Sequence, residues 1–261
     1  MSSLDVWVPP ATPLIESARH SRAKATVAVT LFNYAEVVLQ ALDSVRAQTL
    51  SDLDLVVVDD CSGDGGPETV RRWMAARQDR FGRCTLLRHE RNQGLAAARN
   101  QAFMASHTPF VFVLDADNEL YPRCLAACLD AATASHADAV YTLLEVFGGD
   151  TGVMGTDLWD PQTLQSGNYL DAMALVARSA WQSVGGYRRM PANGWEDFDL
   201  WLKFAEAGFK VVRVPEILCR YRKHAASMLR SETNRSGTIG ALHEDIELYH
   251  PAARLPLPNS D

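Results

Sequence analysis

The sequence has no long apolar run and no sign of a secretion signal. Its longest uncharged stretch, residues 101–114, includes Ser, His, Thr and Pro. It is shorter than the run of about 18 apolar residues that a helix needs to span a bilayer. Asp5 stands where a secretion signal carries basic residues, and no apolar segment follows it. We therefore expect a cytoplasmic protein without a transmembrane segment, with association at the inner face of the membrane as an alternative.

Basic residues and cysteines are also few. Lys and Arg number 25 against 32 Asp and Glu, a formal net charge of −7, and no local basic patch is found, so we expect no nucleic-acid partner. The glycine-rich patterns GxGxxG and GxxxxGK[ST] are missing, which argues against a dinucleotide dehydrogenase and a P-loop enzyme. The five scattered cysteines contain no CxxC pair and are typical of reduced thiols: Cys61, Cys84, Cys124, Cys128 and Cys219.

Short apolar segments alternate with segments of helical periodicity from residue 26 to about residue 134. This alternation predicts an α/β fold with a mostly parallel central sheet sandwiched by helices, whose ligands bind beyond the carboxyl ends of the strands. The predicted strands are residues 26–32, 55–58, 84–88 and 110–114; the predicted helices are 35–47, one opening at Pro67, 94–106 and 122–134.

The regular alternation of strands and helices ends after residue 138. Beyond it, strands are predicted at 140–147, 171–177, 209–214 and 218–221, and a helix is predicted at 195–207. No repeat, low-complexity tract or clear linker divides the chain. We expect an N-terminal arm or short helix outside the core (1–24), one α/β domain (25–225) and a helical or irregular C-terminal extension (226–261).

Polar side chains follow four predicted strands, and parallel strands would bring them to one rim: Asn33 and Tyr34, Asp59 and Asp60, Arg91 and Asn92, Asp115 and Asp117. Asp115 and Asp117 either converge on a hard cation such as Mg²⁺ or Mn²⁺ or form a polar turn before a helix. Asp59 and Asp60 either bind a base or ribose or form a turn and helix cap.

The segment WEDFDLW at 195–201 separates its acids on the predicted helix. Asp197 shares the apolar side with Trp201 and Phe204, whereas Glu196, Asp199, Lys203 and Glu206 fall on the opposite side. Because an unpaired buried carboxylate is costly, Asp197 either helps to cap the helix or reaches into a site as a base. A similar acidic segment, 243–249, lacks an apolar side and predicts a solvated helix.

Two other side chains have open roles. Arg99 lies on a helix whose start, residues 92–100, is made mostly of small residues, so it either approaches a ligand or covers the surface. His224 follows the last predicted strand and either completes a metal site with Asp117 or is an ordinary hydrogen-bonded imidazole.

Taken in order, these motifs resemble the inverting, nucleotide-sugar-dependent glycosyltransferases of family 2, which have the GT-A fold. The matching segments are VAVTLFNY (27–34), VVVDDCS (56–62), NQGLAAARN (92–100), LDADN (114–118), VGGY (184–187), WEDFDLWL (195–202) and YRKH (221–224). Each motif alone is weak, but the ordered set is specific. Val29 departs from the family, which commonly has proline there.

The resemblance implies that Thr30, Asn33 and Tyr34 line a nucleotide pocket and that Asp59 or Asp60 binds the base. The donor would be a nucleotide sugar, most simply a UDP-sugar, bound with Mn²⁺ or Mg²⁺.

The resemblance also implies which residues act on the sugar. Arg99 would approach the nucleotide sugar, Asp115 would face the ribose or donor sugar, and Asp117, the second acid of the DXD motif, would hold the ion. Asp197 matches the family's catalytic base, with Glu196 beside it at the acceptor side.

The implied reaction is sugar transfer with inversion to a glycan, lipid-linked or small-molecule acceptor, in the biosynthesis of a polysaccharide or glycoconjugate, with a homodimer as one assembly. A glycosidase would need a pair of acids flanking the bond. A receiver domain would need a lysine, and none lies between Lys24 and Lys203. A sugar nucleotidyltransferase, which would need a basic phosphate loop, and a catalytically silent nucleotide-sugar-binding protein are the alternatives.

Overall fold

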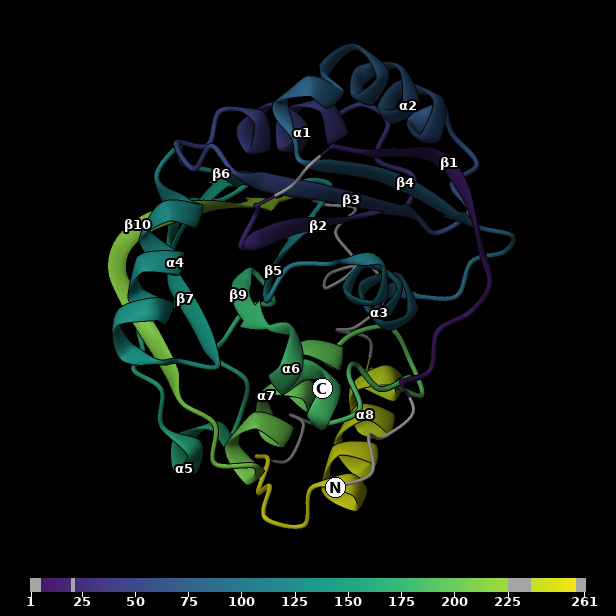
Figure 1. The fold of residues 1–261 in the computed structure, drawn as a ribbon. Coiled ribbons are helices and arrows are strands. Elements are labelled where there is room, and N and C mark those ends of the chain that lie inside the picture. The colour runs from purple at the N-terminus through teal and green to yellow at the C-terminus, as the bar shows by residue number, and fades with distance from the viewer. Residues whose placement is uncertain (1–5, 20–21, 225–235, 257–261) are drawn as a thin grey trace.

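The computed structural model describes residues 6–19, 22–224 and 236–256. Within these ranges, ten strands form one sheet in the order β1-β4-β3-β2-β5-β9-β7-β10-β6, and β8 pairs with β7 (Figure 1). The strands are β1 (Ala11–Ala18), β2 (Ala25–Leu31), β3 (Leu53–Asp59), β4 (Arg83–His89), β5 (Phe110–Asp115), β6 (Glu119–Leu120), β7 (Ala139–Gly148), β8 (Gly152–Met154), β9 (Ala174–Ala177) and β10 (Val211–Lys223).

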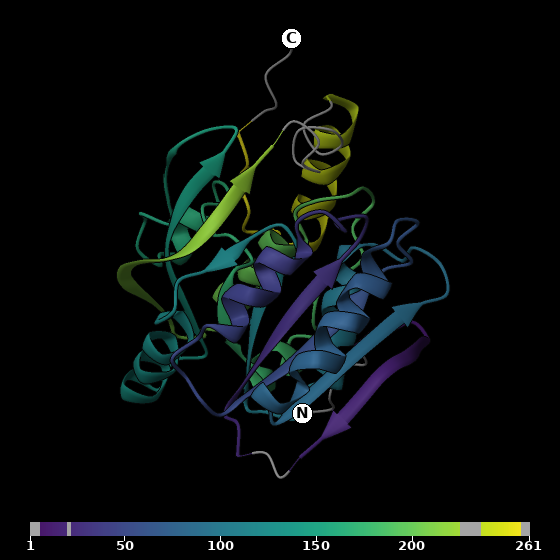
Figure 2. The ribbon, with the colours of Figure 1, turned by 90° about the horizontal axis from the view of Figure 1, so that it is seen from above.

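Helices cover both faces of this sheet. They are α1 (Val38–Arg46), α2 (Gly66–Arg77), α3 (Leu95–Ala105), α4 (Cys124–Ser135), α5 (Pro161–Leu164), α6 (Arg178–Ser183), α7 (Glu196–Glu206) and α8 (Ser236–Tyr249), with a 3₁₀ turn at Gln78–Arg80. Figure 2 looks onto the face that α1 and α2 cover. The predicted α/β architecture is confirmed. None of the described helices is long and apolar enough to cross a membrane.

The sheet has a separate apolar core on each face because side chains alternate along its strands. In β2, every residue is buried: Val27 and Val29 pack toward α1, α2 and α4, while Ala28 packs toward α3, α6 and α7. A strand buried on both sides reads as a continuous apolar run, which is why β2 and β3 are recognisable in the sequence.

Strand direction is parallel from β4 through β3 and β2 to β5 and again between β7 and β10, whereas β9 runs antiparallel to both β5 and β7. The sheet is thus parallel in the half that the alternation predicts and mixed beyond it. The two strands predicted at 209–214 and 218–221 are one strand, β10, with irregular register between Val214 and Cys219.

The described part of the predicted N-terminal arm, residues 6–19 and 22–24, includes a strand of the central sheet. Residues 11–18 are β1, an edge strand that pairs antiparallel with β4. Pro13 lies at a register irregularity, and an edge strand tolerates a proline because its outer N–H groups need no partner.

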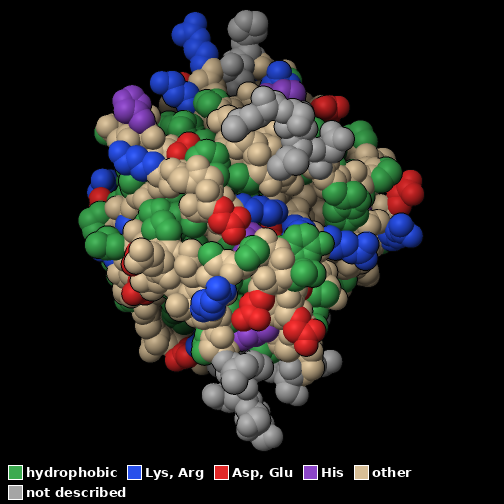
Figure 3. Space-filling view, turned by 90° about the horizontal axis from the view of Figure 1, so that it is seen from below, with side chains coloured by type: hydrophobic (Ala, Val, Ile, Leu, Met, Phe, Trp, Pro, Cys, Tyr) green, Lys and Arg blue, Asp and Glu red, His purple; other side chains and the backbone are tan. Residues whose placement is uncertain are grey.

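The segment 243–249, predicted as a solvated helix, belongs to α8 and is not fully solvated. Leu242 and Ile246 of α8 are completely buried, and Ile246 is part of the core beneath α7. On the face seen in Figure 3, basic, acidic and apolar side chains are interspersed rather than gathered into a patch of one kind.

Candidate functional site

The carboxyl ends of β2 and β5 bring Thr30 and Asp115 together, at the rim that the sequence predicts. The two residues are register partners on neighbouring parallel strands. The Thr30 hydroxyl donates a hydrogen bond to Asp115 Oδ1 at 2.8 Å. This rim is the base on which the other polar side chains assemble.

Arg99 is a buried cation that links this rim to α7. Its Nη2 lies 3.1 Å from both carboxylate oxygens of Asp115, and its Nη1 donates to Glu196 Oε1 at 2.8 Å. Burial alone would lower the pKa of Arg99, but the charges of Asp115 and Glu196 raise it, so the guanidinium stays ionised. With 3% of its surface exposed, Arg99 belongs to the site and does not cover the surface.

Asp117, His224 and Tyr34 form a second polar group beside Asp115. His224 Nε2 lies 3.2 Å from Asp117 Oδ2 and 3.3 Å from the Tyr34 hydroxyl. Burial and the charge of Asp115 raise the pKa of Asp117, whereas the hydrogen bond with His224 lowers it. The structure therefore brings His224 to Asp117, a pairing that the sequence left open.

Asp117 and His224 offer one carboxylate and one imidazole, a donor pair that suits Mn²⁺ better than Mg²⁺, which prefers oxygen ligands. Across residues 6–19, 22–224 and 236–256, no three His, Cys, Asp or Glu side chains gather closely enough to hold a metal ion by themselves. Asp115, the other predicted ligand, is engaged by Arg99 and Thr30. The residues fit an ion that completes its coordination with substrate oxygens.

The first turn of α7 carries Glu196 and Asp197. Asp197 is half-buried, and its Oδ1 accepts the backbone amide of Phe198 at 2.7 Å. Burial and the charge of Glu196 raise the pKa of Asp197 to about 7, although Arg99 acts in the opposite direction. Asp197 can therefore take up or release a proton near neutral pH, as a general base requires.

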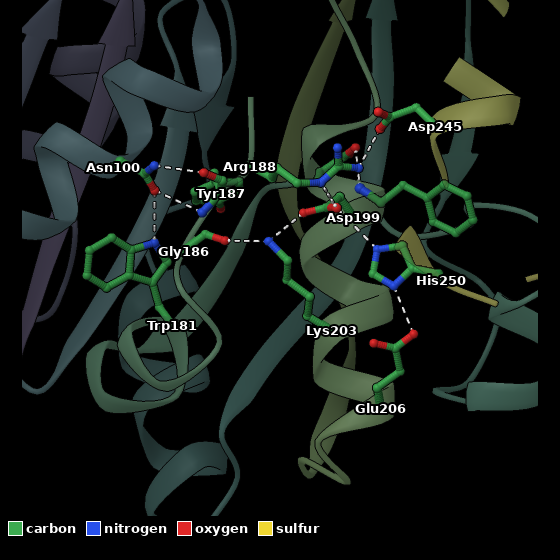
Figure 4. A network of polar contacts seen from close by, with 12 residues as sticks. Asn100, Trp181, Gly186, Tyr187, Arg188, Asp199, Lys203, Glu206, Asp245 and His250 are labelled. Atoms are coloured by element: carbon green, nitrogen blue, oxygen red, sulfur yellow. Dashed lines mark hydrogen bonds and ion pairs between the residues drawn. The ribbon is translucent and has the colours of Figure 1, made fainter. Parts of the chain in front are cut away.

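Glu196 and Asp199 lie on the side of α7 opposite Asp197, as the helical spacing predicts, but that side is buried as well. Glu196 is buried by its pairing with Arg99. Asp199 is completely buried, with an Arg188 nitrogen and the Lys203 ammonium each 2.7 Å away and His250 Nε2 at 3.1 Å (Figure 4). His250 directly follows α8, and the periodicity of α7 alone cannot reveal that another helix covers it.

Asp59 is the last residue of β3 and Asp60 follows it, and both are buried. Burial raises the pKa of Asp59, whose Oδ2 lies 3.3 Å from Arg88 Nε. The Asp60 carboxylate accepts the backbone amides of Gln93 and Gly94 at 2.8 Å each. Both carboxylates therefore hold neighbouring loops in place, and contact of either with a base stays a prediction.

Asn33 joins the loops that follow β2 and β3. Its backbone amide donates to Ser62 Oγ at 2.9 Å, and its Oδ1 accepts the amide of Gly63 at 2.8 Å. Asn33 adopts a left-handed backbone (φ +58°), which asparagine tolerates better than most residues. The side chain is exposed beside the rim, where a nucleotide contact stays a prediction.

Asp171 is a carboxylate of this site that the sequence reading did not single out. The parallel strands place at this rim the residues that follow them. Because β9 runs antiparallel to β5, it begins at the rim and places there the residues that precede it, including Asp171. Burial and the charge of Asp115 raise the pKa of Asp171 to about 6. The only sequence feature that could have indicated this residue is its position as a single acid between two apolar residues, Leu170 and Ala172.

A cavity of about 220 Å³ lies next to Glu196. Residues 92–96, at the start of α3, form one wall, and residues 189–194, before α7, form the other. Arg188 anchors the second wall through its contacts with Asp199 and Asp245 of α8. The cavity is thus shaped by a loop that the C-terminal helix holds.

Comparison with known proteins identifies the family and the fold of this chain. The sequence of residues 26–193 matches the model of glycosyl transferase family 2. The putative glycosyltransferase EpsE of Bacillus subtilis is 27% identical over 93% of this chain and 86% of its own length. The succinoglycan biosynthesis protein ExoO of Rhizobium meliloti is 34% identical over 48% of this chain, which spans 34% of ExoO.

Two solved structures share the fold. Residues 1–349 of S. aureus TarS in complex with UDP-GlcNAc superpose with a TM-score of 0.68 at 18% identity, over 80% of this chain and 61% of that one. The mannosyltransferase PcManGT of Pyrobaculum calidifontis, in complex with GDP-Man and Mn²⁺, superposes with a TM-score of 0.61 at 23% identity. The match covers 84% of this chain and 59% of PcManGT. The GT-A fold that the motifs imply is therefore confirmed, and the chain belongs to glycosyl transferase family 2, a family of sugar-transferring enzymes.

Proposed function

We propose that this enzyme transfers a sugar from a nucleoside-diphosphate sugar to an acceptor hydroxyl with inversion, and that Asp197 is its base. One observation carries the proposal. Arg99 joins Asp115, at the rim where the donor would bind, to Glu196, the neighbour of Asp197. The residue next to a base whose pKa is about 7 is thus paired with the same buried cation as Asp115, the carboxylate proposed to face the donor.

Thr30, Asn33 and Tyr34 surround the place where the nucleotide would lie, and a UDP-sugar is the simplest donor. Both relatives of known structure named above carry a nucleotide sugar, and one also contains Mn²⁺. Asp117 and His224 would hold the divalent ion, with Asp115 facing the ribose or the sugar. When bound, the ion would neutralise the charge that develops on the leaving diphosphate.

Asp197 would remove the proton of the acceptor hydroxyl as its oxygen attacks the anomeric carbon. The bond between that carbon and the diphosphate oxygen breaks on the opposite side, so the configuration inverts. One carboxylate suffices because the diphosphate leaves without needing a protonated acid. The 220 Å³ cavity would receive the acceptor, since Glu196, the neighbour of the base, lines it.

The replacement Asp197→Asn tests this assignment. The variant keeps shape and hydrogen-bonding capacity but cannot accept a proton, so we expect transfer to be lost while the donor and Mn²⁺ still bind. Asp117→Ala should instead weaken donor binding in the presence of Mn²⁺. A loss of donor affinity of the same size in both variants would refute the role of Asp197. Donor binding without transfer or hydrolysis in the unaltered protein would favour a catalytically silent binding protein.

A further inference from the structure

Asp171 has a fixed place at the rim because of how β9 enters the sheet. Leu175 pairs with Phe112 and Val176 with Val111 in the antiparallel ladder of β9 and β5. Continuing that register places residue 172 opposite Asp115, so Asp171 lies one step beyond the end of β5. The chain arriving at β9 therefore delivers a carboxylate beside the carboxylates that β5 presents.

The side chain of Asp171 is held in one orientation with one oxygen available. Its Oδ1 accepts the backbone amide of Met173 at 2.8 Å. In the described parts of the chain, no residue donates a hydrogen bond to the other oxygen. Leu170 and Ala172 on either side are buried, so the backbone of this segment is fixed.

The surroundings of Asp171 are strongly acidic. The charges of Asp115 and Asp117 raise the pKa of Asp171, and the charge of Asp171 raises the pKa of Asp197, so Asp171 interacts electrostatically with the rim carboxylates and with the proposed base. Arg99 is the cation that offsets them, and it is already paired with Asp115 and Glu196. Above pH 6 to 7, an available carboxylate oxygen here accepts hydrogen bonds and repels anions.

We propose that Asp171 binds a hydroxyl group of the transferred sugar and thereby selects neutral, hydroxyl-bearing sugars over sugars that carry a carboxylate. The inference rests on the proposed function, since it assumes that the sugar lies between Asp115 and Asp197. The hydroxyl donates to the oxygen that Met173 leaves available. A uronate at the same place would set two like charges against each other in a partly buried site.

The test compares binding of a nucleoside diphosphate alone, the same nucleotide carrying a neutral hexose, and the corresponding uronate. UDP, UDP-glucose and UDP-glucuronate with Mn²⁺ at pH 8 come first, followed by the GDP and dTDP series. Titration calorimetry without acceptor measures the unaltered protein, Asp171→Asn, and Asp130→Asn, an exposed carboxylate on α4 that serves as the control.

We expect the hexose to bind at least tenfold more tightly than the uronate in the unaltered protein. Asp171→Asn should weaken hexose binding by about tenfold, as loss of a hydrogen bond to a charged group predicts. The replacement should also reduce the difference in affinity between the hexose and the uronate, and it should leave the affinity for the bare nucleotide unchanged. Asp130→Asn should match the unaltered protein.

Two results would overturn the role of Asp171. One is equal affinity for hexose and uronate in the unaltered protein, a comparison that needs no variant to fold. The other is a folded Asp171→Asn variant in which hexose and bare nucleotide keep the same ratio of affinities. If none of the three diphosphates binds at all, the proposed function itself fails, which is a different and recognisable outcome.

Discussion

Arg222 Nε donates a hydrogen bond to the backbone carbonyl oxygen of Asp117 at 2.8 Å. The Arg222 amide also donates to Asn118 Oδ1 at 2.8 Å, and its guanidinium donates to Glu119 at 2.9 Å. These three hydrogen bonds, all donated by Arg222, hold the segment after β5 to β10, the strand that leads to His224. The two proposed metal ligands are therefore held to each other by a residue that touches neither side chain.

Arg222→Gln should weaken Mn²⁺ binding by about tenfold, the usual effect of losing a residue that orients a metal ligand. The rate of transfer at saturating Mn²⁺ should fall much less. Electron paramagnetic resonance of free Mn²⁺ measures the affinity directly. Arg123→Gln, which removes an exposed ion pair with Glu216, is the control. If both variants bind Mn²⁺ with the same affinity, Arg222 has no positioning role.

Arg99→Met should lower the free energy of unfolding by roughly 3–5 kcal/mol, because Asp115 and Glu196 lose the cation between them. Urea unfolding measures this change. Arg71→Met breaks the exposed pair with Glu68 and should leave stability unchanged. A small effect at Arg99, similar to that at Arg71, would mean that the two carboxylates are stable without it.

The rate of transfer should rise as the pH increases through about 7, because only the ionised form of Asp197 accepts a proton and its pKa is raised to about 7. The free energy of unfolding should instead decrease as the pH rises. A carboxyl whose pKa is raised in the folded state favours folding when protonated, so this contribution fades as the pH rises from about 4 to about 7. Rate profiles and thermal unfolding across pH 5–9 measure both trends. In Asp197→Asn, the unfolding profile should flatten over this range.

His250→Ala should lower the free energy of unfolding by about 1.5–3 kcal/mol at pH 6, since it removes buried contacts with Asp199 and Glu206. Burial alone would lower the pKa of His250, but these two carboxylates raise it above 6.5. The stabilisation is thus complete below pH 6.5 and is lost as the pH rises through the folded-state value. Urea unfolding at pH 6 and pH 9 should show a larger effect at pH 6. His107→Ala, at an exposed histidine, should show none.

The parallel half of the sheet was predictable because its strands are buried on both faces and present their polar residues just after they end. Thr30, Asp115 and Asp117 follow from that rule. Asp171 does not, because β9 begins where its neighbours end. The burial of Asp199 does not follow either, because the periodicity of one helix gives its apolar side but not which distant segment covers the other side.

The edge strand β1 and the contacts of α8 depend on pairing between segments far apart in the chain. Glu16 of β1 pairs with Thr85 of β4, and Asp245 of α8 contacts Arg188. Neither element has a local pattern that names its partner. What the sequence predicted best was therefore local geometry repeated along the chain, and what it missed was contact between remote segments.

The burial of Asp199 beneath His250 has a consequence for how the enzyme can be altered. Asp199 is two residues from Asp197 on the same helix, and part of its charge is balanced from beyond residue 235. Removing α8, or fusing a bulky domain that displaces it, would expose the Asp199 carboxylate in the first turn of α7. Residues 236–250 thus support the helix that carries the proposed base, and changes to them should be judged by turnover as well as by yield.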